Sequence, residues 1–375
     1  MNSMFFYGSL RHEPLLQLVL GQDLSNLHIQ DATLADHAIH WAVNEEFPII
    51  VATPGAMCKG ALIHGIDDAM MRRVDLYEGA SDYQKSVFQV ETATGTGSAL
   101  VYVPTPGKWE PGAPWTLADW QERFGEFATL VAAEMMAGAD RYTPADIDRL
   151  YPSMAQRAAA KLLARKEPVR KTPSGLGVSD VEVIKTHRPY TEFFALHEFD
   201  LHHRRFDGST SPKLTRAVFM GTDAAILLPY DPVRDCVMVV EQFRPGLMAR
   251  GDHMPWCLEP IAGRVDAGES PEECARREAV EEAGLSLGAL ELITSSYPTP
   301  GASSEYFYIY VGIADLPEGA AGFGGMVGEA EDIAAHIIPF EKAMEMADSN
   351  ALAAGPLVLA LNWLARHRDR LRANA

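Results

Sequence analysis

The sequence predicts an α+β protein of two domains, and three observations support this prediction. The chain has 375 residues, which is enough for two domains of about 100–200 residues each. Short β-branched or aromatic runs bounded by turn residues fill the first hundred residues, and similar runs return after residue 180. Helical spacing of apolar residues is strongest between these two regions.

The first part of the chain is expected to contain strands joined by turns, with one early helix. The strand candidates are MFFYGSL, ALIHGID, SVFQVET and SALVYVP. The helix is predicted at Glu13 to Leu20 and is ended by Gly21. A helix is also predicted over 116–138, and another begins at Thr143 with a proline in its first turn.

Residues 165–180 (RKEPVRKTPSGLGVSD) combine charge, proline, glycine and serine, which favours a linker and places a domain boundary there. Strands are predicted again after this segment. They are VEVIKTHR, FFALHEFDLHHRRF, AAILLPY, CVMVVEQF, YFYIYVGIA and IAAHIIP. Helices are predicted at Pro271 to Ala283 and at about Pro356 to Leu371, the second with a basic end that suits the helix dipole.

Composition excludes several classes of protein. The formal net charge is −19, which repels nucleic acid and anionic membranes, so neither is expected as a partner. No window approaches 18 uninterrupted apolar residues, and the first twenty residues lack the pattern of a secretion signal. The four cysteines are far apart, which favours reduced thiols and a cytoplasmic location.

The strongest motif runs from Gly263 to Leu285. Ser270 and Pro271 open its helix, and Glu278, Glu281 and Glu282 share one helix face. Carboxylates packed so closely need a hard cation, which favours Mg²⁺, with Mn²⁺ as the alternative. Arg277 can pair with Glu269. The competing interpretation is a solvated acidic helix face.

This segment resembles the Nudix box, whose spacing it matches throughout. Over about residues 180–372 the chain is similar to the ADP-ribose pyrophosphatases of that family. Pro300 follows the box within the loop YPTPGASSE, and the acidic run 329–332 precedes a strand. The resemblance implies an α/β/α sandwich that hydrolyses ADP-ribose to AMP and ribose 5-phosphate with Mg²⁺. Related enzymes cleave GDP-mannose, so the reaction is better defined than the nucleotide-sugar substrate.

The same resemblance implies a role for individual residues. The metal ligands would be Glu278, Glu282, Glu331 and the carbonyl of Ala262. Glu329 would be the catalytic base, although Glu329 and Glu331 could exchange roles, and Glu281 and Glu282 would complete the catalytic group. The substrate-binding candidates are Arg216, Arg244, Phe193, Pro300 and Glu305.

Several of these roles have structural alternatives. Arg216 and Arg244 could be surface salt-bridge partners, and Pro300 could only form a turn. Either Phe193 or Phe194 is expected in the core, as is Trp256. Ala217 stands where the subfamily often has an acid, which leaves sugar recognition open. The family also implies a homodimer with exchanged strands, in which Phe193 stacks on adenine.

Two weaker signals lie in the first domain. Tyr7, Gly8, Ser9 and Leu10 form a strand-to-turn segment whose backbone amides can surround a carboxylate. Glu78 is a single carboxylate before a turn glycine and could transfer a proton. A structural role is an equally good interpretation of each signal alone.

Together, these motifs resemble the gamma-glutamylcyclotransferase-like (AIG2-like) group over about residues 3–110. The resemblance implies a mixed β-barrel with helices, in which Glu78 moves a proton during 5-oxoproline formation and the Tyr7 to Leu10 loop holds the substrate. The expected domains are 1–110, a helical extension and linker at 111–180, and the Nudix domain at 181–372. Alternatively, the chain is a gamma-glutamyl cyclotransferase that acts through Glu78, and its Nudix domain hydrolyses another nucleotide sugar such as GDP-mannose or only senses a nucleotide. In a third hypothesis the first domain is a non-catalytic dimerisation or ligand-binding module.

Overall fold

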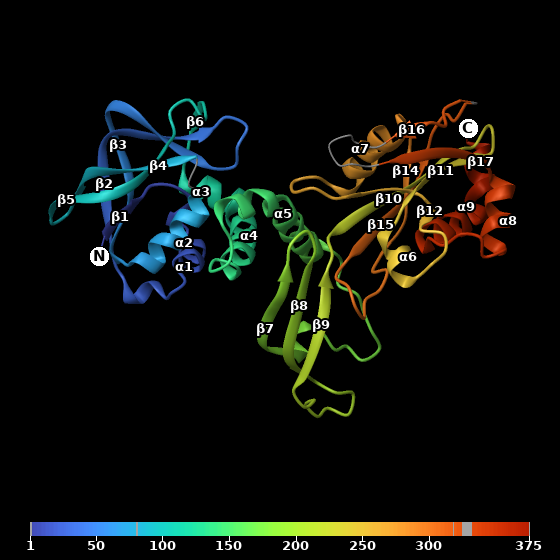
Figure 1. Ribbon diagram of the computed structural model, residues 1–375, viewed down its shortest axis with the longest axis horizontal. Coiled ribbons are helices and arrows are strands. Elements are labelled where there is room, and N and C mark those ends of the chain that lie inside the picture. The colour runs from blue at the N-terminus through green and yellow to red at the C-terminus, as the bar shows by residue number, and fades with distance from the viewer. Residues whose placement is uncertain (1, 80–81, 318, 325–331, 375) are drawn as a thin grey trace. The chain divides into compact units, whose positions relative to one another are not determined.

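The computed structural model describes residues 2–79, 82–317, 319–324 and 332–374 (Figure 1). The chain divides into two compact units, residues 1–158 and 159–375. The division falls within helix α5 (Pro144–Lys166), so the first part of this helix belongs to one unit and its last turns to the other. No helix in the described ranges combines the length and apolar character needed to span a membrane.

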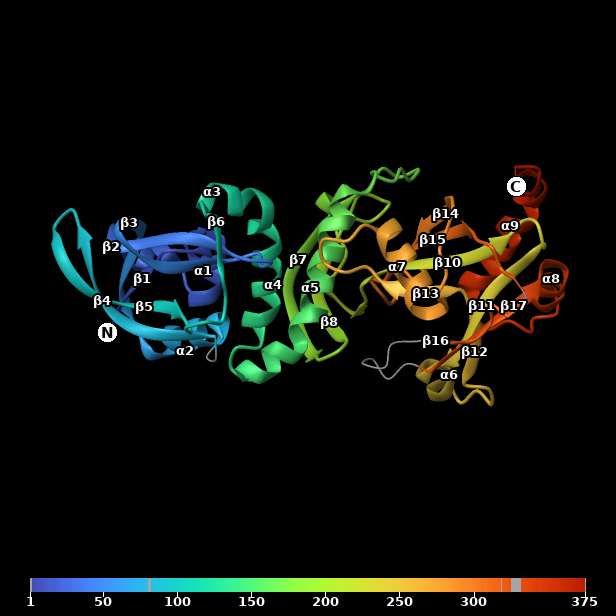
Figure 2. The same cartoon turned by 90° about the horizontal axis from the view of Figure 1, so that it is seen from above.

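The first unit is built on a closed β-barrel of five strands (Figure 2). Around the barrel the order is β3, β1, β5, β4 and β2, and β2 pairs again with β3. Among the described strands of the barrel, only β1 and β5 pair in parallel, which confirms the predicted mixed barrel. The strands are β1 (Asn2–Phe6), β2 (His28–Ala42), β3 (Pro48–Ile66), β4 (Tyr83–Thr92), β5 (Gly95–Pro104) and the added β6 (Pro111–Pro114).

Helices close one side of this barrel. They are α1 (Glu13–Leu20), α2 (Asp68–Glu78), α3 (Leu117–Trp120), α4 (Glu126–Ala137) and α5, with a π-helical turn at Gln121–Gly125 and 3-10 turns at Ser9–Arg11 and Leu24–Asn26. The prediction for α1 is confirmed at both ends. The single helix predicted at 116–138 is interrupted by the π turn, and α2 and β2 had not been predicted.

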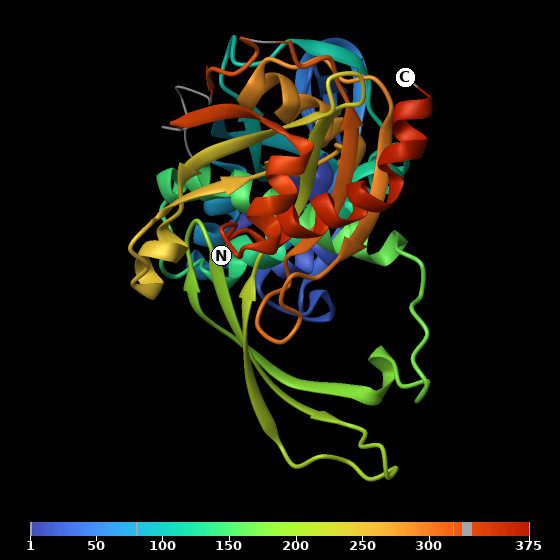
Figure 3. The ribbon, with the colours of Figure 1, turned by 90° about the vertical axis from the view of Figure 1, so that its right-hand side faces the viewer.

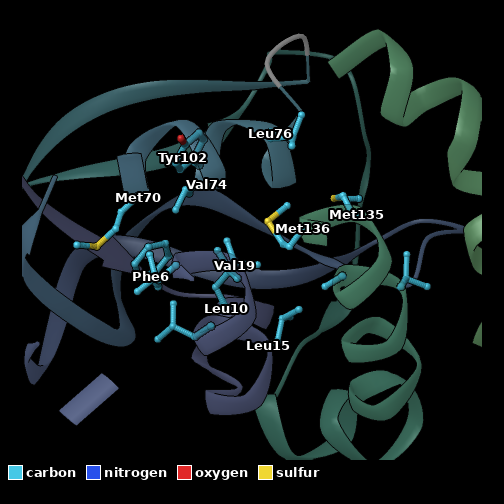
Figure 4. Close-up of a cluster of buried hydrophobic side chains, with 14 of the residues drawn as sticks. Phe6, Leu10, Leu15, Val19, Met70, Val74, Leu76, Tyr102, Met135 and Met136 are labelled. Atoms are coloured by element: carbon cyan, nitrogen blue, oxygen red, sulfur yellow. The ribbon is translucent and has the colours of Figure 1, made fainter. Parts of the chain in front are cut away.

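Buried side chains from the barrel and these helices form one core (Figure 4). Leu15 and Val19 come from α1, Met70 and Val74 from α2, and Met135 from α4. Full burial of such side chains is worth about 1.5–3 kcal/mol each. The helical extension after residue 110 is therefore part of the core of the first unit, and not a free appendage.

The second unit contains a mixed sheet between two helical layers. Its strands are β10 (Asp223–Asp231), β11 (Cys236–Phe243), β12 (Trp256–Glu259), β13 (Ile261–Arg264), β14 (Leu290–Ser296), β15 (Tyr306–Ile313), β16 (Phe323–Gly324) and β17 (Ile333–Pro339). Helix α7 (Pro271–Ala283) packs on one face, and α8 (Phe340–Asp348) and α9 (Gly355–Ala373) pack on the other (Figure 3). This arrangement confirms the predicted α/β/α sandwich. The short helix α6 (Pro245–Arg250) follows β11, and a 3-10 turn lies at Val178–Asp180.

A separate antiparallel sheet precedes the sandwich. It consists of β7 (Val181–Thr191), β8 (Ala195–His203) and β9 (Leu214–Met220), in that order. Figure 3 shows it extending away from the main sheet. Several large apolar side chains on or beside it are exposed, including Val183, Ile184, Tyr190 and Phe219. Apolar exposure of this kind is typical of a surface that another molecule covers.

Candidate functional site

Helix α7 carries most of the site that the sequence predicts, and local signals define both of its ends. Ser270 is the N-cap: its side chain accepts a hydrogen bond from the backbone of Glu273, whose own side chain accepts one from Ser270 N. Gly284 ends the helix with φ of 62°, a left-handed conformation that glycine adopts readily. The predicted capping at both ends is confirmed.

Arg277 joins the loop before the helix to the acidic face of α7. Its Nε donates to Glu269 Oε1 at 2.9 Å, and its Nη2 donates to Glu269 Oε2 at 3.0 Å. Its Nη1 donates to Glu278 Oε1 at 2.6 Å and to Glu281 Oε2 at 2.8 Å. The predicted pair of Arg277 and Glu269 is confirmed. This bidentate geometry is one that guanidinium provides and a lysine ammonium cannot.

The hydrogen bonds of this arginine also change the acidity of its partners. Partial burial acts to raise the pKa of Glu269, but hydrogen bonds from Arg277 and from the Asp266 amide, together with the charge of Arg277, bring the pKa below its usual value. Hydrogen bonds to Glu269, the charge of Glu278, and hydrogen bonds to Glu281 and Glu278 raise the pKa of Arg277. The Glu269 carboxylate is thus held in its charged form.

Glu278 and Glu282 lie against strand β13. A Cβ built on Gly263 would come within 1.7 Å of Glu278 Oε1, so glycine leaves the space that this carboxylate occupies. Glu282 is only 3% exposed, and the Ala262 amide donates to its Oε2 at 3.4 Å. Two buried or half-buried carboxylates beside the backbone of β13 offer oxygen donors, which fit a hard divalent cation.

The other acidic candidates contribute unequally to the described site. Glu281 is engaged by Arg277. Glu329 and Glu331, the expected base and third metal carboxylate, lie outside the described residues. Across residues 2–79, 82–317, 319–324 and 332–374, no three His, Cys, Asp or Glu side chains gather closely enough to hold a metal ion. The described donor set is therefore the pair Glu278 and Glu282 beside Ala262.

Arg264 connects two of the substrate-binding candidates. Its guanidinium lies over the Phe193 ring, 4.3 Å from the centroid. Burial raises the pKa of Glu305, and the positive charge of Arg264 acts against that rise. Arg264, the residue after Gly263 in the box, thus contacts the Phe193 ring and interacts through its charge with Glu305. Sequence reasoning did not select Arg264, although its position directly after the box glycine was an available signal.

The remaining candidates on this side lie at the surface or in salt bridges. Arg244 Nε donates to Glu259 Oε2 at 2.7 Å, in agreement with the alternative that it is a salt-bridge partner. Arg216 is exposed on β9, and its Nη1 donates to the carbonyl of Thr215. Pro300 lies in an exposed loop.

Two expectations about the core are wrong. Trp256 is 54% exposed and packs edge-on against Phe243, because β12 lies at the margin of the sheet. Phe193 and Phe194 are 57% and 42% exposed, so neither belongs to the core of this chain. Both lie in the short turn between β7 and β8, at the end of the separate sheet.

The first unit contains a cavity of about 320 Å³ at one end of the barrel. The predicted loop Tyr7 to Leu10 and Glu78 both line it, so the fold brings these two distant motifs together. A Cβ on Gly8 would come 2.8 Å from Pro48 Cγ, which explains the need for glycine at this bend. Burial raises the pKa of the Glu78 carboxyl from 4.5 to about 7. A carboxyl with that pKa can both accept and donate a proton near neutral pH.

Aromatic side chains that the sequence did not single out complete this cavity. Tyr77, Tyr102, Trp109 and Tyr151 all line it. Burial, with the nearby Glu78 charge as a second cause, raises the pKa of Tyr77 above its usual value, so this phenol stays protonated. Only the position of Tyr77 beside Glu78 could have indicated its role. The others come from distant strands and helices, and the fold alone assembles them.

Family models match both parts of the chain. The model described as "NUDIX domain" matches residues 220–358, and the one described as "Gamma-glutamyl cyclotransferase, AIG2-like" matches residues 4–122. Among curated proteins, the ADP-ribose pyrophosphatase of Escherichia coli (strain K12) is 38% identical over 200 residues, which cover 53% of this chain and 95% of that protein. The ADP-ribose pyrophosphatase of Haemophilus influenzae is 34% identical, over 49% of this chain and 86% of that protein.

A second group of relatives is named for a different substrate. The GDP-mannose pyrophosphatase of Salmonella arizonae is 35% identical over 149 residues, which cover 40% of this chain and 76% of that protein. Both groups match a segment no longer than the second unit of this chain, and the box with its helix α7 lies in that unit. The chain therefore belongs to the Nudix hydrolase family, and it carries an AIG2-like gamma-glutamyl cyclotransferase domain ahead of its Nudix domain.

Proposed function

We propose that the Nudix domain hydrolyses the diphosphate bond of ADP-ribose to give AMP and ribose 5-phosphate, with Mg²⁺ as its cation. The observation that carries the proposal is the placement of Glu278 and Glu282 against Gly263 and Ala262, with Arg277 fixing the acidic face. The identity of 38% to an ADP-ribose pyrophosphatase over 95% of that protein supports the choice of substrate.

In this proposal Glu278, Glu282, Glu331 and the carbonyl of Ala262 hold the cation, for which Mn²⁺ can substitute. A divalent cation held there would neutralise the diphosphate charge and would activate the attacking water. Glu329 accepts the proton of that water, and the oxygen attacks phosphorus while the bridging P–O bond breaks. Glu281 acts through Arg277, which keeps Glu278 in place.

Binding of the nucleotide sugar is assigned to the side of the site where Arg264 lies. Phe193 stacks on the adenine, and Glu305 accepts a hydrogen bond from a ribose hydroxyl. Arg216 and Arg244 contact the phosphates or the terminal ribose. Pro300 shapes the loop that carries Glu305. The exposed apolar side chains of β7 to β9 support a homodimer, in which Phe193 reaches the partner's site.

The test is AMP release from ADP-ribose with millimolar Mg²⁺, measured beside GDP-mannose and NADH. Glu282→Gln should lower AMP release by at least about a hundredfold, because it removes a charged oxygen donor without changing side-chain shape. Glu272→Gln, on the exposed side of the same helix, is the matched control and should retain activity. Faster turnover of GDP-mannose than of ADP-ribose would contradict the proposed substrate but support the proposed hydrolysis of a diphosphate bond. Normal activity of Glu282→Gln would refute the site.

A second function is favoured by a specific observation in the first unit. Glu78 lines an open cavity and has a pKa of about 7, which suits an acid/base group. We propose that this domain cyclises γ-glutamyl compounds. The α-amine attacks the γ-carbonyl carbon, the amide bond to the departing amine breaks, and Glu78 carries a proton from the attacking amine to the leaving one.

The expected products are 5-oxoproline and a free amine, with no water consumed. Liquid chromatography of a γ-glutamyl dipeptide incubated with the full chain measures both. Glu78→Gln should abolish 5-oxoproline formation and leave AMP release intact. Glu282→Gln should abolish AMP release and leave 5-oxoproline formation intact. Absence of 5-oxoproline from a panel of γ-glutamyl dipeptides and amines would leave the cavity as a binding site only.

A further inference from the structure

One wall of the cavity in the first unit comes from outside the barrel. Ala128, Val131 and Met135 of α4 line it, as do Ile147 and Tyr151 of α5. These residues lie beyond the segment 4–122 that the AIG2-like model matches. The loop Tyr7 to Leu10 and Glu78 belong to the matched segment. The cavity therefore has one wall within the segment that the AIG2-like model matches and one wall outside it.

The helical wall is apolar in its inner part and acidic at its outer end. Met135 and Ile147 are buried, whereas Asp148, one residue further along α5, is exposed. Aromatic rings of Phe47, Tyr83, Trp109 and Tyr151 also line the cavity (Tyr151 from α5 itself). Such rings surround an aliphatic chain well and attract a positive charge through their π faces.

Charge in the cavity is one-sided. Its lining contains the carboxylates Glu78, Asp82 and Asp148, and none of the described lining residues is lysine or arginine. Asp82 is already paired with Lys108 outside the lining, at 2.7 Å, and the more distant charges of Asp148 and Glu45 also act on this lysine. Glu45 and Glu46 add negative charge near Tyr151, because their charges contribute to the raised pKa of that phenol. Arg123 offsets part of the charge of Glu46.

We propose that the wall formed by α4 and α5 selects the departing group of the substrate, and that Asp148 makes this group an aliphatic amine with a positively charged outer end. The proposal rests on the cyclotransferase function proposed above. The γ-glutamyl moiety lies between the Tyr7 to Leu10 loop and Glu78, and the alkyl chain runs along Met135 and Ile147. Cyclisation then releases a diamine, which takes up the proton that Glu78 transfers.

The test compares two γ-glutamyl amides of equal shape, γ-glutamyl-putrescine and γ-glutamyl-pentylamine, which differ only in the charged end. The full chain should turn over the putrescine amide with about tenfold higher kcat/KM, the size expected for a charge contact in a partly desolvated, aromatic site. Asp148→Asn should reduce this ratio to below about threefold, and Asp148→Lys should invert it. Asp140→Asn, an exposed acid between α4 and α5, is the matched control and should keep the wild-type ratio.

Calorimetric binding of both amides to the full-length Glu78→Gln chain separates this proposal from the cyclotransferase function. Tighter binding of the putrescine amide, with no 5-oxoproline from the wild-type chain, refutes the reaction and supports the selective wall. Equal kcat/KM values and equal affinities for the two amides refute the selective wall, even if both amides are cyclised. Absence of binding by either amide refutes it as well. Melting curves of the Asp148 variants show whether the fold is retained.

Discussion

At the scale of single residues, Gly263 has the most direct consequence for the Nudix site. A methyl group at this position would overlap the Glu278 carboxylate, which Arg277 also holds. The carboxylate is the end of a flexible side chain, so it can move at small cost in stability. Gly263→Ala should therefore lower AMP release by about tenfold or more while the melting temperature changes by only a few degrees.

Gly246→Ala is the control for Gly263→Ala, since a Cβ at Gly246 would meet nothing within 4 Å and φ there is not positive. Activity assays and melting curves of the two variants give the comparison. Equal activity of Gly263→Ala and the wild-type chain would mean that the Glu278 carboxylate acts from another position.

Glu78 makes a different prediction, which concerns pH. Its pKa is about 7 in the folded chain and 4.5 ordinarily, because burial disfavours the charged form. The folded state thus binds more protons than the unfolded state between these two values, so stability falls as pH rises from about 4.5 to 7. The penalty, fully present above pH 7, is on the order of 3 kcal/mol at most.

Glu78→Gln removes this penalty. The variant should melt at a higher temperature than the wild-type chain at pH 8, and the difference should vanish near pH 4.5. Glu122→Gln, an exposed residue in the same unit, should show no such pH-dependent difference. Calorimetric melting curves at the two pH values measure this. A constant difference across the range would show that burial does not control the Glu78 carboxyl.

At the scale of elements, predictions succeeded where a local signal marks both ends of a segment. Helix α7 begins at Ser270 and Pro271 and ends at Gly284, and α1 ends at Gly21, whose φ is 74°. Helix α2 was missed because its apolar positions are few and its motif was read as a turn before Gly79. Strand β2 was missed because its 15 residues include several charged and histidine side chains. Pairing with β3 overrides those weak local preferences.

Helix α5 leads to a prediction about where the Nudix unit begins. Leu163 packs on the core beneath α7, and Tyr308 donates to Glu167 Oε1 at 2.9 Å. Arg170 hydrogen-bonds to Tyr306 and lies over the Tyr297 ring. The last turns of α5 and the segment after it, which composition alone favours as a linker, therefore also contribute contacts to the Nudix core.

A fragment covering 159–375 should melt at a clearly higher temperature than one covering 181–375, because the shorter one loses two side-chain hydrogen bonds of about 1 kcal/mol each and exposes apolar surface. Circular dichroism melts of both fragments measure the difference. Lys166→Ala in the longer fragment, at an exposed position of the same helix, should behave like the unchanged fragment. Equal melting temperatures would support a domain that begins after residue 180.

At the scale of the whole molecule, sequence motifs identified both domains, but the sites depend on how distant segments meet. The box glutamates, Glu78 and the Tyr7 loop were selected because each lies within a short pattern. Tyr151 and Asp148 were not, because they reach the cavity only through the packing of α4 and α5 against the barrel. Asp223 was also missed. Its burial, together with the charge of Glu167, raises its pKa to about 7, and the sequence has no local sign of that pair.

The excess of acidic residues also predicts how the whole chain responds to Mg²⁺. With a net charge of −19, and with Glu278 and Glu282 both placed against strand β13, we expect repulsion among carboxylates to destabilise the metal-free chain. A cation that binds only the folded state adds about 2.7 kcal/mol of stability at a hundred times its dissociation constant. Millimolar Mg²⁺ should therefore raise the melting temperature of the Nudix transition by about 5 °C or more.

Ionic strength must be matched with NaCl, because general screening of the acidic surface would also stabilise the chain. The Mg²⁺-specific part of the shift should be lost in Glu282→Gln and retained in Glu272→Gln, which changes the total charge equally. It should be absent from the transition of the first unit. A shift of the same size in both variants would assign the effect of Mg²⁺ to the acidic surface as a whole, and the cation would no longer be tied to the box.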